Sequence, residues 1–234
     1  MTLKDILISG KITISGGGGG GGDYTLDGLF TGQEPAGAIE WKATANVPTS
    51  GIAARNAVTS LTVDLSDGYV LNGYSIRDNA ALETVHLNFG ADNAVNIPSY
   101  CVSSNANLTT IVVEGELASI GQSGFRGNNK LKTVDIESLS PNKIGNNAFF
   151  SSTFDTLILR QEDAPILINS TQTFDGTKFA SNGTGGILYV PQALISEYQA
   201  DSIWSTILGY ANNQIKAIEG SIYENAYADG TPIA

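Results

Sequence analysis

One six-residue pattern occurs five times in this chain of 234 residues. Each copy has an apolar residue, two variable residues, an aliphatic residue, one variable residue and a second aliphatic residue. The copies are Val58-Leu61-Val63, Leu82-Val85-Leu87, Leu108-Ile111-Val113, Leu131-Val134-Ile136 and Phe154-Leu157-Leu159, and they start 24, 26, 23 and 23 residues apart. Self-similarity at a period of this length is typical of repeat architectures, so it constrains the fold more than any other feature.

A second motif follows every copy of the first. It joins an aliphatic residue to an apolar residue further on, in Leu71–Ile76, Ile97–Val102, Ile120–Phe125, Ile144–Phe149 and Ile168–Phe174. Aliphatic residues two apart point to the same side of a strand, and the second motif brings the chain back across the core. One unit cannot bury its apolar side alone, so neighbouring units stack and share a core. The pattern predicts a β-rich solenoid of about five rungs over residues 53–184.

The two central copies of the second motif carry a resemblance to a known family. They read Ile120-Gly121-Gln122-Ser123-Gly124-Phe125 and Ile144-Gly145-Asn146-Asn147-Ala148-Phe149. The alternation of L-x-x-[VI]-x-[IVL] with I-G-x-x-A-F resembles the BspA-like class of leucine-rich repeats. That resemblance implies a leucine-rich repeat solenoid, of the kind found on bacterial surface proteins and in some phage virion proteins. The first two repeats depart from the pattern, because Tyr74–Ile76 and Tyr100–Val102 stand where a small residue and Phe are expected.

Four further segments surround the repeats. Residues 185–220 are predicted to form a C-terminal α/β cap of strand, helix and strand, and residues 221–234 a polar tail. Residues 23–52 form a turn-rich connector or N-cap. Residues 1–22 combine a short hairpin with seven consecutive glycines. These glycines are either a flexible linker or a place where chains of a symmetric assembly pack closely, and both interpretations stay open.

The first 22 residues are predicted to attach the protein to an assembly, because an isolated hairpin is only marginally stable in water. The charges at Lys4, Asp5 and Lys11 interrupt its apolar run, so we expect no signal peptide. The predicted attachment residues are Ile6, Leu7, Ile8, Ile12, Ile14, Gly16 and Gly22.

Composition excludes several classes of function. The 12 basic and 23 acidic residues give a net charge of −11, which argues against a nucleic-acid binder. A single cysteine, Cys101, excludes an internal disulfide, and a single histidine, His86, argues against histidine-dependent catalysis and multi-histidine metal sites. No stretch approaches the ~18 apolar residues of a membrane span. We therefore expect no cofactor, no metal, no nucleic-acid partner and no membrane insertion.

The pattern also predicts which residues face outward from the strands, and we call this surface the ladder face. Its first column is Ser60, Thr84, Thr110, Thr133 and Thr156; its second is Thr62, His86, Val112, Asp135 and Ile158; its third is Asp64, Asn88, Glu114, Glu137 and Arg160. The candidate ligand-facing residues are Thr84, His86, Thr110, Glu114, Thr133, Asp135, Glu137 and Thr156.

Each polar group on the ladder face has two interpretations. The threonine column either offers hydroxyls to a polar ligand or stabilises the sheet through cross-strand pairs, and the second is favoured. Asp135 and Glu137, with Glu114 nearby, would act as general acid and base only in a cleft that raises a pKa. A solvated acidic face is favoured instead. No nucleophile with a base and an orienting group is evident, so the chain is not expected to be an enzyme.

Taken with the resemblance, these features lead us to expect a non-enzymatic bacteriophage virion surface protein, either a head fibre, a decoration protein or a tail appendage. It would be attached by its N-terminus and display the repeats for adhesion. The expected partners are other virion proteins, further copies of the chain such as a homotrimer, and a host cell-surface protein or glycan. The alternative is a bacterial cell-surface or secreted BspA-like adhesin. A hydrolase on a repeat scaffold is disfavoured because catalytic groups are missing.

Overall fold

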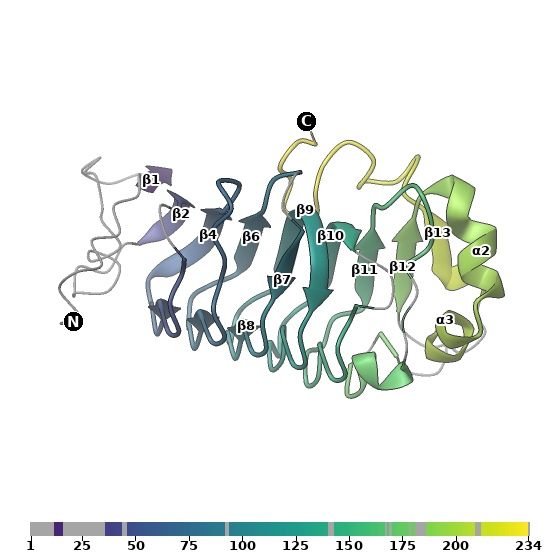
Figure 1. Cartoon of the computed structure of the whole chain (residues 1–234), viewed down its shortest axis with the longest axis horizontal. Helices are drawn as coiled ribbons and strands as arrows, with labels where there is room; N and C mark the ends of the chain where they lie inside the picture. The colour runs from purple at the N-terminus through teal and green to yellow at the C-terminus, as the bar shows by residue number, and fades with distance from the viewer. Residues whose placement is uncertain are drawn as a thin grey trace.

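The computed structural model of the chain describes residues 12–15, 36–43, 46–91, 94–139, 143–166, 168, 170–177, 179–180, 186–208 and 212–233. They form an elongated solenoid whose strands follow one another along the long axis (Figure 1). The large sheet contains β1 (Ile12–Ser15), β2 (Gly37–Lys42), β4 (Val58–Asp64), β6 (Thr84–Asn88), β7 (Val95–Ile97), β9 (Thr110–Ile120), β10 (Thr133–Leu139), β11 (Thr156–Leu159), β12 (Ile187–Val190) and β13 (Ile215–Ala217). The small sheet contains β3 (Ile52–Ala53), β5 (Ile76–Arg77) and β8 (Val102–Ser103). The helices are α2 (Ile195–Ala200) and α3 (Ser202–Ile207), with 3-10 turns at Thr171–Phe174, Gln192–Leu194 and Asn212–Gln214.

Successive repeats pair edge to edge in a common register. The large sheet has the order β1-β2-β4-β6-β9-β10-β11-β12-β13, with β7 also paired to β9, and every pairing except β1 with β2 is parallel. Thr84 lies beside Thr110, which lies beside Thr133, which lies beside Thr156. Equivalent positions of the repeats are therefore neighbours, and the predicted solenoid is confirmed.

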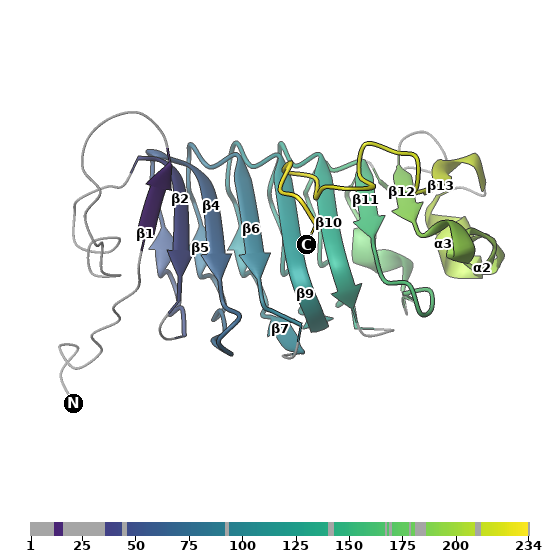
Figure 2. The same cartoon turned by 90° about the horizontal axis from the view of Figure 1, so that it is seen from above.

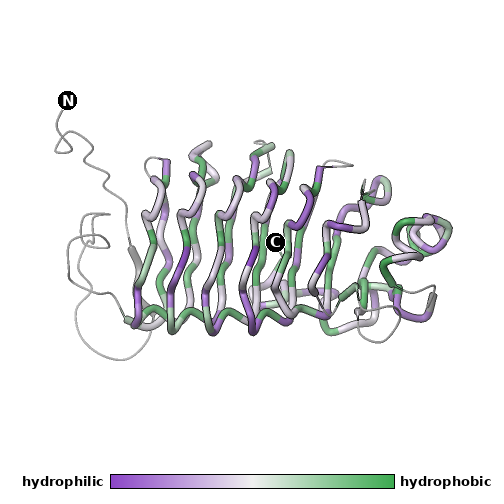
Figure 3. Tube along the Cα trace, turned by 90° about the horizontal axis from the view of Figure 1, so that it is seen from below, coloured by the Kyte–Doolittle hydropathy of each residue, from purple (hydrophilic) through white to green (hydrophobic). Residues whose placement is uncertain are grey.

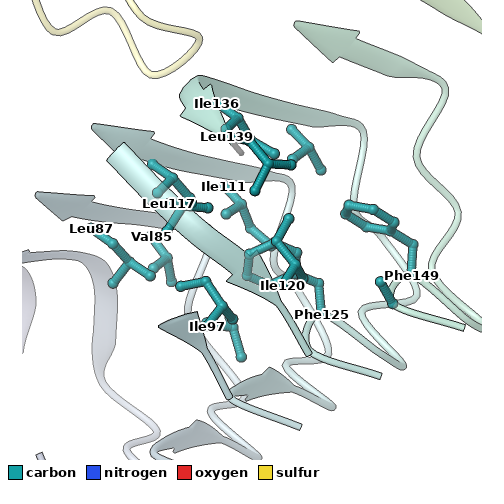
Figure 4. Packing of buried hydrophobic residues seen from close by; sticks show 14 of the residues in the cluster. Val85, Leu87, Ile97, Ile111, Leu117, Ile120, Phe125, Ile136, Leu139 and Phe149 are labelled. Atoms are coloured by element: carbon teal, nitrogen blue, oxygen red, sulfur yellow. The ribbon is translucent and has the colours of Figure 1, made fainter. Parts of the chain in front are cut away.

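The aliphatic residues of the first motif form one wall of the core. Val85 and Leu87 of β6, like Ile111 of β9, are fully buried. Phe125 and Phe149 of the second motif are also fully buried, and their ring centroids are 5.5 Å apart. Figure 4 shows both rings directed toward the strand side chains, and Figure 3 shows apolar segments recurring along the solenoid. The predicted core positions of the repeats are thus confirmed.

The glycine of the Ile-Gly motif is required by the close approach of neighbouring rungs. A Cβ atom at Gly145 would lie 2.7 Å from the backbone nitrogen of Gln122, and one at Gly121 would lie 2.9 Å from that of Ser99. Because Gly145 donates its N–H to the Ile120 carbonyl at 2.7 Å, a side chain would break the pairing of the two rungs.

The chain returns to the sheet through turns with left-handed residues at two repeated positions. The first position is held by Ser50, Tyr74, Tyr100, Ser123 and Asn147, and the second by Ala54, Asp78, Ser104, Gly127 and Ser151. All of them have φ between 55° and 76°. Small polar residues and glycine accept this conformation most readily, which explains the polar residues between the apolar motifs.

Buried asparagines connect these turns. The Oδ1 atom of Asn128 accepts the backbone N–H of Asn105 at 3.0 Å, and that of Asn105 accepts the N–H of Asn79 at 3.1 Å. The Asn128 amide also donates to the carbonyls of Val102 and Phe125, each at 2.9 Å. The side chains thus satisfy backbone groups that the turns leave without strand partners.

The sheet extends beyond the predicted repeats at both ends. β2 pairs in parallel with β4, although residues 23–52 were expected to be a connector, and β1 pairs antiparallel with β2. At the other end, β12 pairs with β11 and β13 pairs with β12. In the sequence, α2 and α3 lie between β12 and β13. The capping role predicted for residues 185–220 stays a prediction.

Candidate functional site

The ladder face is partly covered by the last segment of the chain. We call residues 221–233 the strap. It runs from the β13 end back across β11, β10 and β9 toward β6 (Figure 2). The sequence predicted only that this segment is polar, so its place on the sheet is a new finding.

The centre of the strap is held by an ion pair on two neighbouring strands. Arg160 follows β11, and its Nε and Nη2 atoms each lie 2.8 Å from a carboxylate oxygen of Asp135 on β10. The same guanidinium donates to the strap carbonyls of Tyr223 at 2.8 Å and Ala226 at 2.9 Å. Asp135 in turn accepts the backbone N–H of Ala228 at 2.9 Å. One buried pair therefore binds three backbone groups of the strap.

The far end of the strap is held by the one histidine. His86 Nδ1 lies 2.8 Å from a carboxylate oxygen of Asp229, and its Nε2 atom lies 3.1 Å from one of Glu114. The Tyr227 ring packs edge-on against the imidazole, with centroids 5.4 Å apart, and lies over the Arg160 guanidinium at 5.1 Å. The strap is thus connected to β6, to β10 and to Arg160, which follows β11.

The expected solvated acidic face is wrong for the middle column of the ladder face. Asp135 is fully buried, and His86 is only 3% exposed. Val112 and Ile158, from the same column, are fully buried too. The physical reason is the strap, which removes this column from water and supplies partners for its charged members. The third column stays half-buried, including Glu114 and Glu137, and the side chain of Glu137 accepts the backbone N–H of Gly115.

The remaining candidates form the first column. Thr84, Thr110, Thr133 and Thr156 are in register and half-buried. Thr156 donates to the carboxylate of its neighbour Asp155 at 3.2 Å. The column is thus assembled as predicted, and its role toward a ligand stays a prediction.

Burial and ion pairing set the titration of the strap contacts. Burial lowers the pKa of His86, but the hydrogen bonds and charges of Asp229 and Glu114 outweigh it and raise the pKa above the ordinary value. For Asp229, burial raises the pKa, but the hydrogen bonds from His86 and Thr231 and the charge of His86 together outweigh burial and lower it. Burial raises the pKa of Asp135, and Arg160 offsets only part of this effect. The protonated, imidazolium form of His86 therefore stabilises the contact between the strap and the sheet.

Shallow grooves lie on both sides of the strap. The first, of about 440 Å³, lies toward β2 and is lined by Glu40, Lys42, Asp64, His86 and Glu114 among others. The second, of about 470 Å³, lies toward β12 and is lined by Glu137, Arg160, Glu162, Asp163 and Glu219 among others. Both are open and largely acidic. Over the described part of the chain, no three histidine, cysteine or carboxylate residues are grouped so as to hold a metal ion.

The repeated parallel rungs and their buried motif residues agree with a comparison against protein-family models. The model of the BspA type leucine rich repeat region matches residues 70–178 in six copies. Residues 70–178 are a BspA-type leucine-rich repeat region. Comparison with curated proteins and with solved structures gives no match.

The leucine-rich repeat region at residues 70–178 bears on the broad class of the protein. BspA-type repeats typically occur on surface or extracellular proteins, so the region indicates a surface or adhesion type of repeat protein. Besides the repeats, this chain has a strap that contacts Asp135 and Arg160 and covers part of the ladder face. Within the described residues, no helix combines the length and the apolar character needed to cross a membrane.

The structure describes only some of the predicted attachment residues. Ile6, Leu7, Ile8, Gly16 and Gly22 lie outside the described residues. The remaining two, Ile12 and Ile14, belong to β1, where they pair with Trp41 and Ile39 of β2. The structure thus connects part of the attachment segment to the first edge of the sheet.

Proposed function

We propose that the protein is a non-enzymatic recognition protein of the bacteriophage virion surface, as a head fibre, decoration protein or tail appendage. Its N-terminal segment attaches it to the particle, and its repeats bind a host cell-surface protein or glycan. Other virion proteins and further copies of the chain, as in a homotrimer, are the partners at the attachment end. Such a role places the protein on the outside of the virion.

The non-enzymatic role is supported by the hydrogen-bond partners of the charged residues on the ladder face. Asp135, Arg160 and His86 would be the first choices for acid–base chemistry on this face. Their polar atoms bind Ala228, Tyr223, Ala226 and Asp229 of the strap instead. These groups therefore serve to hold a surface together, which supports recognition rather than turnover.

The order of the strands supports attachment at one end. β1 is the first strand of the large sheet and β13 the last, so the N-terminal segment joins the solenoid at the end opposite β13. An anchor at that end leaves the other rungs free to project from a particle. Repeat solenoids use such extended surfaces to bind partners.

The experiment measures attachment and recognition separately. Labelled full-length protein is mixed with phage particles released by the strain that carries the gene, and with host cells of that strain. We expect co-sedimentation with both. A variant without residues 1–11 retains β1 and should still bind cells but not particles, while a variant without residues 221–233 is the matched control for particle binding. Particle binding that survives loss of residues 1–11 would contradict the attachment.

A bacterial cell-surface or secreted adhesin is the second candidate, because BspA-type repeats typically occur on such proteins. The neighbouring genes separate the two. Capsid or tail genes on either side support the virion protein, whereas an export signal or a surface anchor encoded in the same reading frame supports the adhesin.

A further inference from the structure

Two tyrosines form a stacked pair on the turn side of the solenoid, away from the ladder face. The rings of Tyr74 and Tyr100 are almost parallel, with an angle of 3° and centroids 4.9 Å apart. The Arg126 guanidinium continues the row, 5.9 Å from the Tyr100 centroid and 5.0 Å from that of Phe150. We call Tyr74, Tyr100, Arg126 and Phe150 the aromatic row.

The tyrosines occupy a position where the backbone disfavours them. Tyr74 has φ of 60° and Tyr100 of 58°, a conformation uncommon for bulky residues. Other rungs place Ser50, Ser123 and Asn147 there. Strain of this kind persists only where the surrounding structure enforces it, and it clusters at sites of function. The core gains little from Tyr74, because its side chain is 43% exposed.

One face of Tyr74 is open. Tyr100 is covered by Tyr74 on one side and by Arg126 on the other, whereas within the described residues no ring or cation stacks on the second face of Tyr74. That face is directed toward the preceding rung, where Ser50 donates its N–H to the Tyr74 carbonyl at 3.0 Å. The serine side chain is too small to cover an aromatic ring.

A group of polar side chains lies on the two rungs that meet at Tyr74. The Arg77 guanidinium lies 3.1 Å from the Ser50 hydroxyl and 2.6 Å from the Asp78 carboxylate. Both side chains of this ion pair are well exposed, at 39% and 47%. Hydroxyl, guanidinium and carboxylate groups are thus grouped on the same two rungs as Tyr74. The strap contacts involve none of these residues.

We infer that the Tyr74 face, together with Ser50, Arg77 and Asp78 on the same two rungs, binds a pyranose ring of a surface glycan. The C–H face of a sugar packs on an aromatic ring, while its hydroxyls accept hydrogen bonds from these polar groups and donate hydrogen bonds to them. The net charge of −11 opposes a nucleic-acid strand, which would also stack on tyrosine. This inference rests on the proposed recognition function, because it names the ligand class and the surface that binds it.

The test compares full-length protein and three variants on an array of bacterial and mammalian glycans. Tyr74→Ser installs the residue that the rungs of Ser50 and Ser123 carry, so it relieves strain and should fold. Tyr74→Phe keeps the ring, and Ile222→Ala alters only a residue of the strap that is 84% exposed. We expect Tyr74→Ser to weaken glycan binding about tenfold or more, which corresponds to about 1.4 kcal/mol. Tyr74→Phe and Ile222→Ala should bind as the unaltered protein does.

Other results would overturn the inference in distinguishable ways. Glycan binding that is unchanged in Tyr74→Ser, or lost in Ile222→Ala alone, would place the sugar elsewhere and leave the recognition function standing. Binding to host cells without binding to any glycan would point to a protein ligand, and would also refute the sugar site alone. Absence of binding to both glycans and cells would refute the site and the recognition function together.

Discussion

Replacement of Arg160 by methionine would leave the Asp135 carboxylate buried without its counterion. Asp135 is fully buried and loses two N–H donors at 2.8 Å, keeping only the Ala228 N–H. Removal of one partner from a buried ion pair costs about 3–5 kcal/mol of unfolding free energy. The strap carbonyls of Tyr223 and Ala226 can turn to water, so we add no separate cost for them. Chemical denaturation at pH 7 measures this loss.

Two further variants make the prediction specific. Arg160→Met combined with Asp135→Leu buries no charge and should recover most of the lost stability. Lys42→Met removes an exposed pair with Asp67 at 3.1 Å and should have no measurable effect. Because burial already raises the pKa of Asp135, the deficit of Arg160→Met should shrink as the pH falls and the carboxyl is protonated. An Arg160→Met protein as stable as the parent, or a double variant no better than the single one, would refute the reasoning.

Three other predictions concern the strap, the core and the turns. The raised pKa of His86 means that its contribution to stability is complete below its unfolded pKa of about 6.5 and is lost as the pH rises through the folded pKa. The melting temperature of the parent protein should therefore fall between pH 6 and pH 9, and that of His86→Gln should fall by less. An equal fall in both proteins would contradict the role of His86. Phe149→Ala should cost about 3–5 kcal/mol in urea denaturation and Thr110→Ala far less, since only Phe149 leaves a core cavity; equal losses would be inconsistent with the core. Asn128→Leu should cost about 3 kcal/mol by the same assay, because the N–H of Asn105 and the Val102 carbonyl lose buried partners; a neutral effect would refute the turn network.

The repeat motifs predicted most of the fold because each rung repeats the same local chemistry. Residues such as Val85 and Phe125 alternate with polar ones at spacings that fix both their side and their register. The rung of β2 was missed, although Val47 and Ile52 precede Leu71 and Ile76 at the same spacing. Its first motif, Ala36-Ile39-Trp41, has the same spacing but ends in an aromatic residue, so it departs from the pattern of the other copies.

The covered ladder face could not be predicted from local patterns. Asp135 and Ala228, which share a hydrogen bond, are 93 residues apart, and the strap has no periodicity of its own. One signal was present in the sequence, because Val112 and Ile158 are apolar residues in a column predicted to face water. Apolar residues at outward positions indicate a covering segment, but not which segment covers them.

Hydrogen–deuterium exchange of the strap amides tests the central claim most directly, namely that the charged ladder residues hold the strap on the sheet. The Ala228 N–H, bonded to Asp135, should exchange slowly in the parent protein and quickly in Arg160→Met, while the core amide of Phe125 stays protected in both. Rapid exchange of Ala228 in the parent protein, at the rate of an unstructured peptide, would contradict it.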